Sequence, residues 1–118
     1  MNPQSIISGL LHKRFRQYQD AFIGLYGIDP MAKTKEDAVV TARCVIANEL
    51  RAEGWRVNAI AAVLHKDHST IHHYINKYED YFSIPCYRNE RDVIAHIREA
   101  VGKIDEWDGQ SPEESVTG

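Results

Sequence analysis

The side chains with the most evident chemistry follow one another between residues 65 and 77. Lys66, Asp67 and His68 lead into a segment where hydroxyl, imidazole and amide groups recur at helical spacing. Subtracting the apolar stripe of that helix leaves a polar outward face, which comprises Ser69, Thr70, His72, His73, Asn76 and Lys77. This face holds no acidic residue before Glu79. Such side chains suit a groove lined by base edges and phosphates.

Each position offers a specific donor or acceptor to a DNA duplex. Asp67 can cap a helix and can also accept from the amino group of cytosine, and His68 can donate to guanine or to a phosphate. Thr70 offers a methyl group to the thymine methyl and a hydroxyl to a base edge. Lys66 and Ser69 suit phosphates, aided by the positive end of the helix dipole.

Two helices joined by a tight polar turn are needed to position these groups. Residues 57–64 form a short predicted helix, whose inward face is Val57, Ile60, Ala61 and Leu64. The second helix is expected to start near Asp67 and to run to about Tyr81, and its apolar stripe is Ile71, Ile75, Tyr78 and Phe82. Tyr74 fits either a core position or a contact with the DNA backbone. The arrangement is typical of a helix-turn-helix.

Helical periodicity extends to both sides of this pair. A helix over residues 3–26 is capped by Asn2 and ended by Gly27, and its stripe is Ile7, Leu11, Phe15, Tyr18, Phe22 and Leu25. Another opens with a capping-box pattern of Thr34 and Asp37 and ends at Gly54; its inward residues are Ala38, Val39, Ala42, Val45, Ile46 and Leu50. The last covers roughly residues 89–104, with inward residues Val93, Ile94, Ile97, Val101 and Ile104.

The fold class is therefore all-α, with about five helices in a single domain over residues 1–104. The chain of 118 residues has a formal charge of −3, with 14 basic and 17 acidic residues. Five of the acids lie in residues 105–118, so the remaining 14 basic and 12 acidic residues sum to +2. The terminal segment 105–118 is polar and rich in Gly, Ser and Pro, which predicts a disordered acidic tail.

The octet from Lys66 to His73 resembles the signature of the C-terminal DNA-binding domain of the bacterial replication initiator DnaA. That signature reads approximately Arg-Asp-His-Thr-Thr-Val-x-His, and this chain has Lys-Asp-His-Ser-Thr-Ile-His-His. The resemblance covers roughly residues 33–82 and implies a Trp-repressor-like helix-turn-helix core with a flanking helix on each side. It implies that Asp67, His68 and Thr70 face bases in the major groove, with Lys66 and Ser69 beside the backbone.

The chain departs from this family at three places. The family's basic, arginine-containing loop corresponds here to residues 33–35, where Lys33 and Lys35 flank a threonine. Leu64 and His65 stand where the family has a glycine pair, and Tyr74 replaces a small residue.

Double-stranded DNA is the expected partner, in transcription or replication control and with a phage origin as an option. The expected DNA-binding residues are Lys66, Asp67, His68, Ser69 and Thr70, with His73 and Lys77 as second choices. Backbone contacts are expected from Lys33, Lys35, Arg43 and Arg56. The first or the last helix could also mediate a homodimer, which would place two recognition helices one DNA turn apart.

Other classes of function remain open or are disfavoured. A protein-interaction module, such as a phage structural or terminase-small-subunit-like component, is the main alternative. His68 and His72 have the i, i+4 spacing of a zinc pair, with His65 and His73 nearby, but no metal site is expected. We expect no catalysis and no cofactor, because the glycines form neither GxxxxGK nor GxGxxG and Cys44 lies in an apolar stripe. With no apolar run near 18 residues and Cys44 and Cys86 far apart, we expect a reduced protein in the cytoplasm of a bacterial or phage-infected cell.

Overall fold

The computed structural model describes residues 3–109, with side chains described for residues 8–103. Its elements in chain order are α1 (Pro3–Tyr26), α2 (Asp37–Ala52), α3 (Val57–Leu64), α4 (His68–Ser83), the 3-10 turn η1 (Pro85–Tyr87) and α5 (Arg88–Gly109). The described part of the chain contains no β-strand, so the all-α prediction is confirmed. None of the described helices is both long and apolar enough to cross a membrane.

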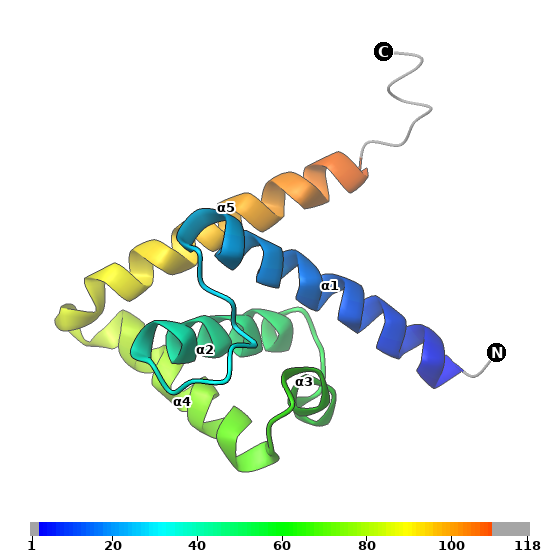
Figure 1. The fold of residues 1–118 in the computed structure, drawn as a ribbon, viewed down its shortest axis with the longest axis horizontal. Coiled ribbons are helices and arrows are strands. Elements are labelled where there is room, and N and C mark those ends of the chain that lie inside the picture. The colour runs from blue at the N-terminus through cyan, green and yellow to red at the C-terminus, as the bar shows by residue number, and fades with distance from the viewer. Residues whose placement is uncertain (1–2, 110–118) are drawn as a thin grey trace.

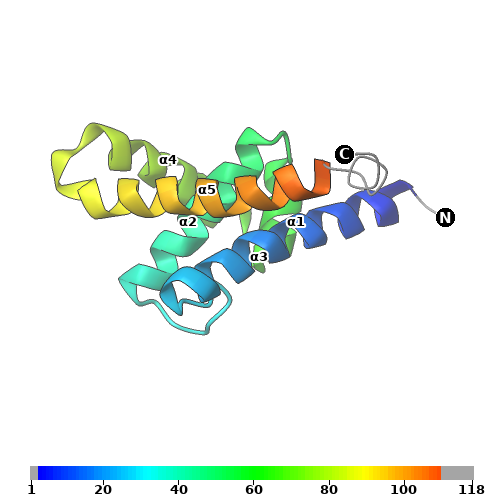
Figure 2. The same ribbon diagram turned by 90° about the horizontal axis from the view of Figure 1, so that it is seen from above.

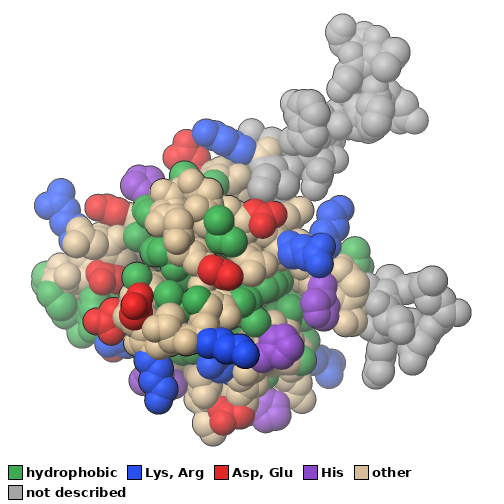
Figure 3. Space-filling view, in the orientation of Figure 1, with side chains coloured by type: hydrophobic (Ala, Val, Ile, Leu, Met, Phe, Trp, Pro, Cys, Tyr) green, Lys and Arg blue, Asp and Glu red, His purple; other side chains and the backbone are tan. Residues whose placement is uncertain are grey.

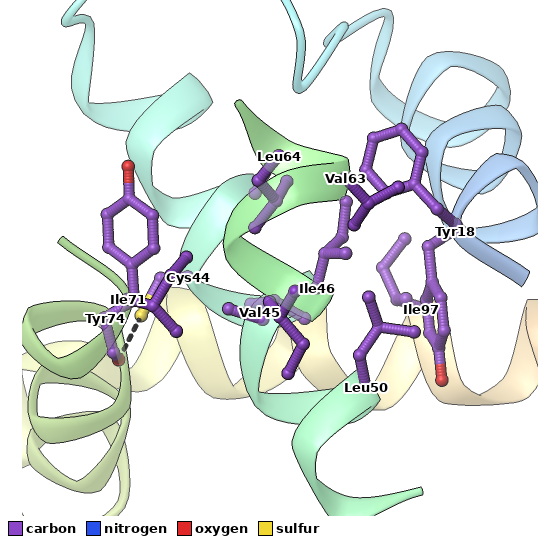
Figure 4. Packing of buried hydrophobic residues seen from close by; sticks show 14 of the residues in the cluster. Tyr18, Cys44, Val45, Ile46, Leu50, Val63, Leu64, Ile71, Tyr74 and Ile97 are labelled. Carbon is purple, nitrogen blue, oxygen red and sulfur yellow. Dashed lines mark hydrogen bonds between the residues drawn. The ribbon is translucent and has the colours of Figure 1, made fainter. Parts of the chain in front are cut away.

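Helix α2 lies at the centre of the molecule. Every side chain from Ala42 to Ala47 is buried, and so is Leu50. A helix that is buried on nearly all sides must be covered by several neighbours. In Figure 1, α3 and α4 lie below α2, while α1 and α5 lie above it. Figure 4 shows Ile46 and Leu50 of α2 among side chains of α3, α1 and α5.

Helices α1 and α5 form an outer layer, which Figure 2 shows nearest the viewer. Helix α1 buries Leu11, Phe15, Tyr18 and Phe22, as the periodicity predicted. Helix α5 buries Ile94, Ile97 and Val101. The side chains of Ile7 and Ile104, the ends of the two predicted stripes, lie outside the described residues.

Two carboxylates, the buried Glu49 of α2 and the exposed Glu53 at its C-cap, connect this outer layer to α2. Glu49 is 8% exposed and accepts hydrogen bonds from Tyr78 Oη at 2.9 Å and Arg98 Nε at 2.8 Å, which joins α2 to α4 and α5. Burial, and next the Glu49 charge, raise the pKa of Tyr78, so this phenol stays protonated and donates. Glu53 accepts in the same way from Arg14 Nε at 2.8 Å and from Tyr18 Oη.

Three residues predicted to face inward are exposed instead. Leu25 and Phe82 are each 51% exposed, and Ala38 is also on the surface. The face of α4 that meets the core passes through Ile71, Tyr74 and Tyr81, which are buried. Phe82 is one residue, or about 100°, further round the helix from Tyr81, and its ring meets that of Tyr78 edge to face, with 5.2 Å between centroids.

Two predicted boundaries also differ from the structure. Thr34 does not cap α2, because Glu36 is the N-cap residue and makes no side-chain cap bond. Thr34 Oγ1 accepts from Glu36 N at 3.2 Å, a local turn that precedes the helix. Helix α5 continues to Gly109, so the tail predicted to begin at residue 105 starts within a helix. The rest of that predicted tail, residues 110–118, lies outside the described residues.

Replacing Leu50 by Ala should destabilise the protein strongly, because Leu50 is fully buried where α1, α2 and α5 meet. We expect the free energy of unfolding to fall by about 2–5 kcal/mol in urea denaturation followed by circular dichroism. Leu25→Ala makes the same change at an exposed leucine and should alter stability by roughly 0.5 kcal/mol or less. Equal losses from the two variants would contradict the packing described here.

Candidate nucleic-acid interface

The turn between α3 and α4 is built by two local motifs. His65 ends α3 in the left-handed region at φ 56°. Its N–H donates to Ala62 O at 3.3 Å, and the N–H of Lys66 donates to Ala61 O at 2.9 Å. These two bonds form a Schellman motif, the usual way to end a helix in a left-handed residue. His65 thus adopts the left-handed conformation at the place where the related family has a glycine pair.

Asp67 then begins α4 as its N-cap. Its Oδ1 accepts from Thr70 N at 2.8 Å, which confirms the predicted cap. This bond is the main reason why the pKa of the Asp67 carboxyl is lowered from its ordinary value. The carboxylate is therefore charged near neutral pH and fixed against the helix end. A hydrogen bond from the Thr70 side chain lowers the pKa of this carboxyl further.

The side chains around this cap are open to solvent. Lys66, His68 and Ser69 are exposed and Thr70 is half-buried. Within the described residues, no hydrogen bond or ion pair occupies the side chains of Lys66, His68 or Ser69. Because these donors have no hydrogen-bond acceptor among the described residues, they can donate to a ligand. Figure 3 shows His and Lys or Arg side chains gathered along the lower side of the molecule, where α4 begins.

Further along α4, the predicted residues divide into free and engaged groups. His72, His73 and Asn76 are exposed, and His73 remains a candidate contact. Lys77 is half-buried, and its Nζ donates to Tyr87 Oη at 2.8 Å and lies 5.0 Å from the centre of that ring. The ammonium is thus held by η1, which makes Lys77 a weaker candidate than its sequence position suggested. Tyr74, left open by the sequence, is 5% exposed and packs in the core.

The loop before α2 brings a second lysine to the same surface. Lys33 and Lys66 both line an open hollow of about 440 Å³ between this loop and the α3–α4 turn. Leu64 and His65 form part of its wall. The sequence pattern does not mark His65 as a site residue, because only the tertiary contact of loop and turn creates the hollow. Two cations at one hollow favour an anionic ligand such as a phosphate.

Arg43, predicted to contact the DNA backbone, has a different role. It is 6% exposed and donates to the carbonyl oxygens of Pro30 at 2.8 Å, Thr34 at 3.1 Å and Ala32. Its burial and these three bonds to the loop that carries Lys33 argue against the predicted backbone contact, although Arg43 is also among the residues that line the hollow. Arg43 is therefore a positioning residue for that loop.

The remaining predicted backbone contacts lie apart from the hollow. Lys35 is exposed in the loop but does not line the hollow. Arg56 is exposed at the N-cap of α3, and the eight residues of that helix separate it from the turn. Both remain predictions.

The described residues provide little for other chemistries. They contain no group of three or more His, Cys, Asp or Glu side chains that could hold a metal ion. Cys44 is buried, its thiol donates to Tyr74 O at 2.9 Å, and burial raises its pKa to about 11. A thiol with that pKa is almost entirely protonated at neutral pH and is a poor nucleophile.

Arg43→Met should destabilise the protein without changing the number of phosphate contacts. We expect the free energy of unfolding to fall by roughly 1–3 kcal/mol in urea denaturation, because three carbonyl groups lose a charged donor. The matched control is Arg56→Met, at an exposed arginine, which should change stability by about 0.5 kcal/mol or less. Unchanged stability for Arg43→Met would refute its structural role.

Comparison with known protein families places one similarity over this surface. Residues 46–95 match the family described as "Putative ATPase subunit of terminase (gpP-like)". The matched segment runs from the second half of α2 into the first turns of α5, so it includes the whole α3–turn–α4 unit. Neither the curated proteins nor the solved structures gave a match. The similarity relates this segment, less than half of the chain, to a terminase family, and no comparison matched the replication-initiator domain.

Proposed function

We propose that this protein is a non-catalytic, sequence-selective binder of double-stranded DNA, and that it acts as part of a phage-derived, terminase-like assembly. The observation that carries the proposal is the start of α4. There Lys66, His68 and Ser69 are exposed and without intramolecular partners, beside a capped helix end that fixes their positions. The family similarity over residues 46–95 supports the phage context.

In the proposed complex, the first turn of α4 enters the major groove. This placement lets Asp67, His68 and Thr70 reach base edges, as N-terminal residues of a recognition helix do. The Thr70 methyl group contacts a thymine methyl, and His68 donates to guanine. The dipole of α4 points its positive end at the duplex and adds to the attraction of the phosphates.

Two lysines supported by the fold supply the non-specific part of the affinity. Lys66 projects from the turn and Lys33 from the neighbouring loop, at one hollow. The three bonds from Arg43 hold that loop in place before DNA arrives. A preorganised pair of cations loses less conformational entropy on binding than two free side chains would. In this proposal, Lys33 supplies the positive charge that the basic loop supplies in the replication-initiator family.

The name of the matched family includes an ATPase, but the matched residues favour binding over catalysis. Residues 46–95 contain a single glycine, Gly54, which ends α2. A phosphate-cradling loop of the GxxxxGK type needs two glycines and a lysine in sequence. We therefore assign to this segment the recognition of DNA. Control of transcription or replication, implied by the initiator resemblance, is the alternative setting for the same chemistry.

Thr70→Ala should reduce affinity for the selected sequence and leave affinity for random DNA nearly unchanged. We expect a loss of about 1–3 kcal/mol on the selected site, because one contact to a base edge disappears. The site is first obtained by selecting the bound fraction of a random duplex pool, and affinities are then measured by fluorescence anisotropy. Equal losses on both duplexes would remove Thr70 from the base-reading residues.

Lys66→Ala should weaken binding to every duplex by a similar factor. The slope of log affinity against log salt should become shallower by roughly one unit, because one phosphate contact is lost. The control is Lys103→Ala, which removes an exposed lysine from α5, paired only with Glu99 at 3.4 Å. That control should leave the slope unchanged. A change in specificity with Lys66→Ala, at constant slope, would contradict its assignment to phosphate.

An assembly module is the second candidate function. It is favoured by large apolar side chains on the surface, since Leu10 is 56% exposed, Ile23 is 44% exposed and Leu25 is 51% exposed. The anisotropy experiment separates the two candidates. Absence of any binding to the random pool at low salt would reject the DNA proposal and leave protein association as the function of the fold.

A further inference from the structure

An apolar hollow with an acidic rim lies where the end of α1 meets the starts of α2 and α5. It measures about 270 Å³, and its apolar walls come from Phe22, Tyr26, Ile28, Ala38 and Val93. Asp37 and Glu90 are the charged residues among those that line it, and no described Lys or Arg does so. Asp92 is close enough to Tyr26 to help burial raise the pKa of that phenol. The hollow suits an apolar side chain that has a cation beside it.

The N-terminal half of α1 presents that combination on the surface. Leu10 is 56% exposed, and Lys13, three residues later, lies on the same side of the helix and is also exposed. Arg16 lines a shallow hollow beside Lys13 and adds a second cation, while Asp20 also lines that hollow. No acidic residue occurs between residues 8 and 19. Leu10 is thus an exposed apolar side chain next to Lys13, on a stretch of α1 without acidic residues of its own.

We propose that these two surfaces bind each other between copies of the chain, with Leu10 and Lys13 of one copy docked in the acid-rimmed hollow of the next. Leu10 would fill the space between Phe22 and Val93, and Lys13 would pair with Asp37 or Glu90. The positive charge of Lys13 is complementary to the carboxylates at the rim of the hollow. The apolar side chain of Leu10 likewise suits the apolar walls of the hollow. This proposal does not rest on the proposed DNA binding, because neither surface includes the start of α4.

The two surfaces cannot meet within one molecule, because they lie on the same straight helix. Leu10 and Phe22 are 12 residues apart, which is roughly 18 Å along α1. Since the two surfaces differ, the contact is head-to-tail, and it leaves one free surface of each kind at the ends of any open chain. A contact centred on one leucine and one ion pair belongs to the small, weak class of interfaces. Association should therefore appear only at high protein concentration and should decrease with salt.

Sedimentation velocity of the full chain tests the proposal without DNA. The mean mass should rise above the monomer value of 13.5 kDa as concentration increases from roughly 10 to 500 μM at low salt. Lys13→Glu and Glu90→Lys should each abolish the rise, and so should Leu10→Ser. Combining Lys13→Glu with both Asp37→Lys and Glu90→Lys restores opposite charges and should recover association. Circular dichroism of each variant establishes that the helices are intact.

Matched controls change the same residue types elsewhere. Lys103→Glu places the same charge change on α5, and Ile84→Ser removes an apolar side chain that is 40% exposed after α4. Both controls should associate as the unchanged protein does. A mass that stays at the monomer value over the whole range would overturn the proposal, as would association unaffected by Leu10→Ser and Lys13→Glu. If Lys13→Glu weakens DNA binding while the protein stays monomeric, the α1 surface is a DNA contact and the proposal is wrong.

Discussion

The near-complete burial of α2 is the constraint on which the rest of this structure depends. All side chains from Ala42 to Ala47 are inside, so no face of this stretch can be left to solvent. Helices α1, α3 and α4 pack directly on α2, and Ala42 and Ala47 leave room for these neighbours. The relative positions of α3 and α4, and hence of the turn between them, follow from how these helices pack on α2.

Two buried charged residues of α2, Arg43 and Glu49, fix the neighbouring loop and helices relative to α2. Arg43 leaves the core towards the preceding loop and binds three of its carbonyl oxygens, and Glu49 binds Tyr78 of α4 and Arg98 of α5. A buried charge is costly unless its hydrogen bonds are satisfied, so each of these residues demands a particular arrangement of its partners. One fixes the loop beside the candidate DNA-binding surface, and the other fixes α4 against the outer layer.

The distribution of charge separates the surfaces that we propose to be functional. Exposed cationic side chains occur at the start of α4, with Lys66, and on α1, with Lys13 and Arg16. Carboxylates line the hollow at the other end of α1. The net charge of −3 is low, yet the molecule carries cationic and acidic side chains on separate surfaces. These local charges, rather than the net charge, bear on which partners it binds.

Features of this protein that depend on local interactions could be predicted from the sequence. Features that depend on contacts between distant segments could not. The helices, the Asp67 cap and the exposure of Lys66, His68 and Ser69 follow from helical periodicity and from bonds that span three or four residues. The burial of Arg43, the engagement of Lys77 by Tyr87 and the exposure of Phe82 do not, because each depends on where another helix or loop lies. The meeting of Lys33 with Lys66 is of the same kind. Residues separated by a whole helix leave no spacing in the sequence that marks them as neighbours, and only packing on α2 brings them together.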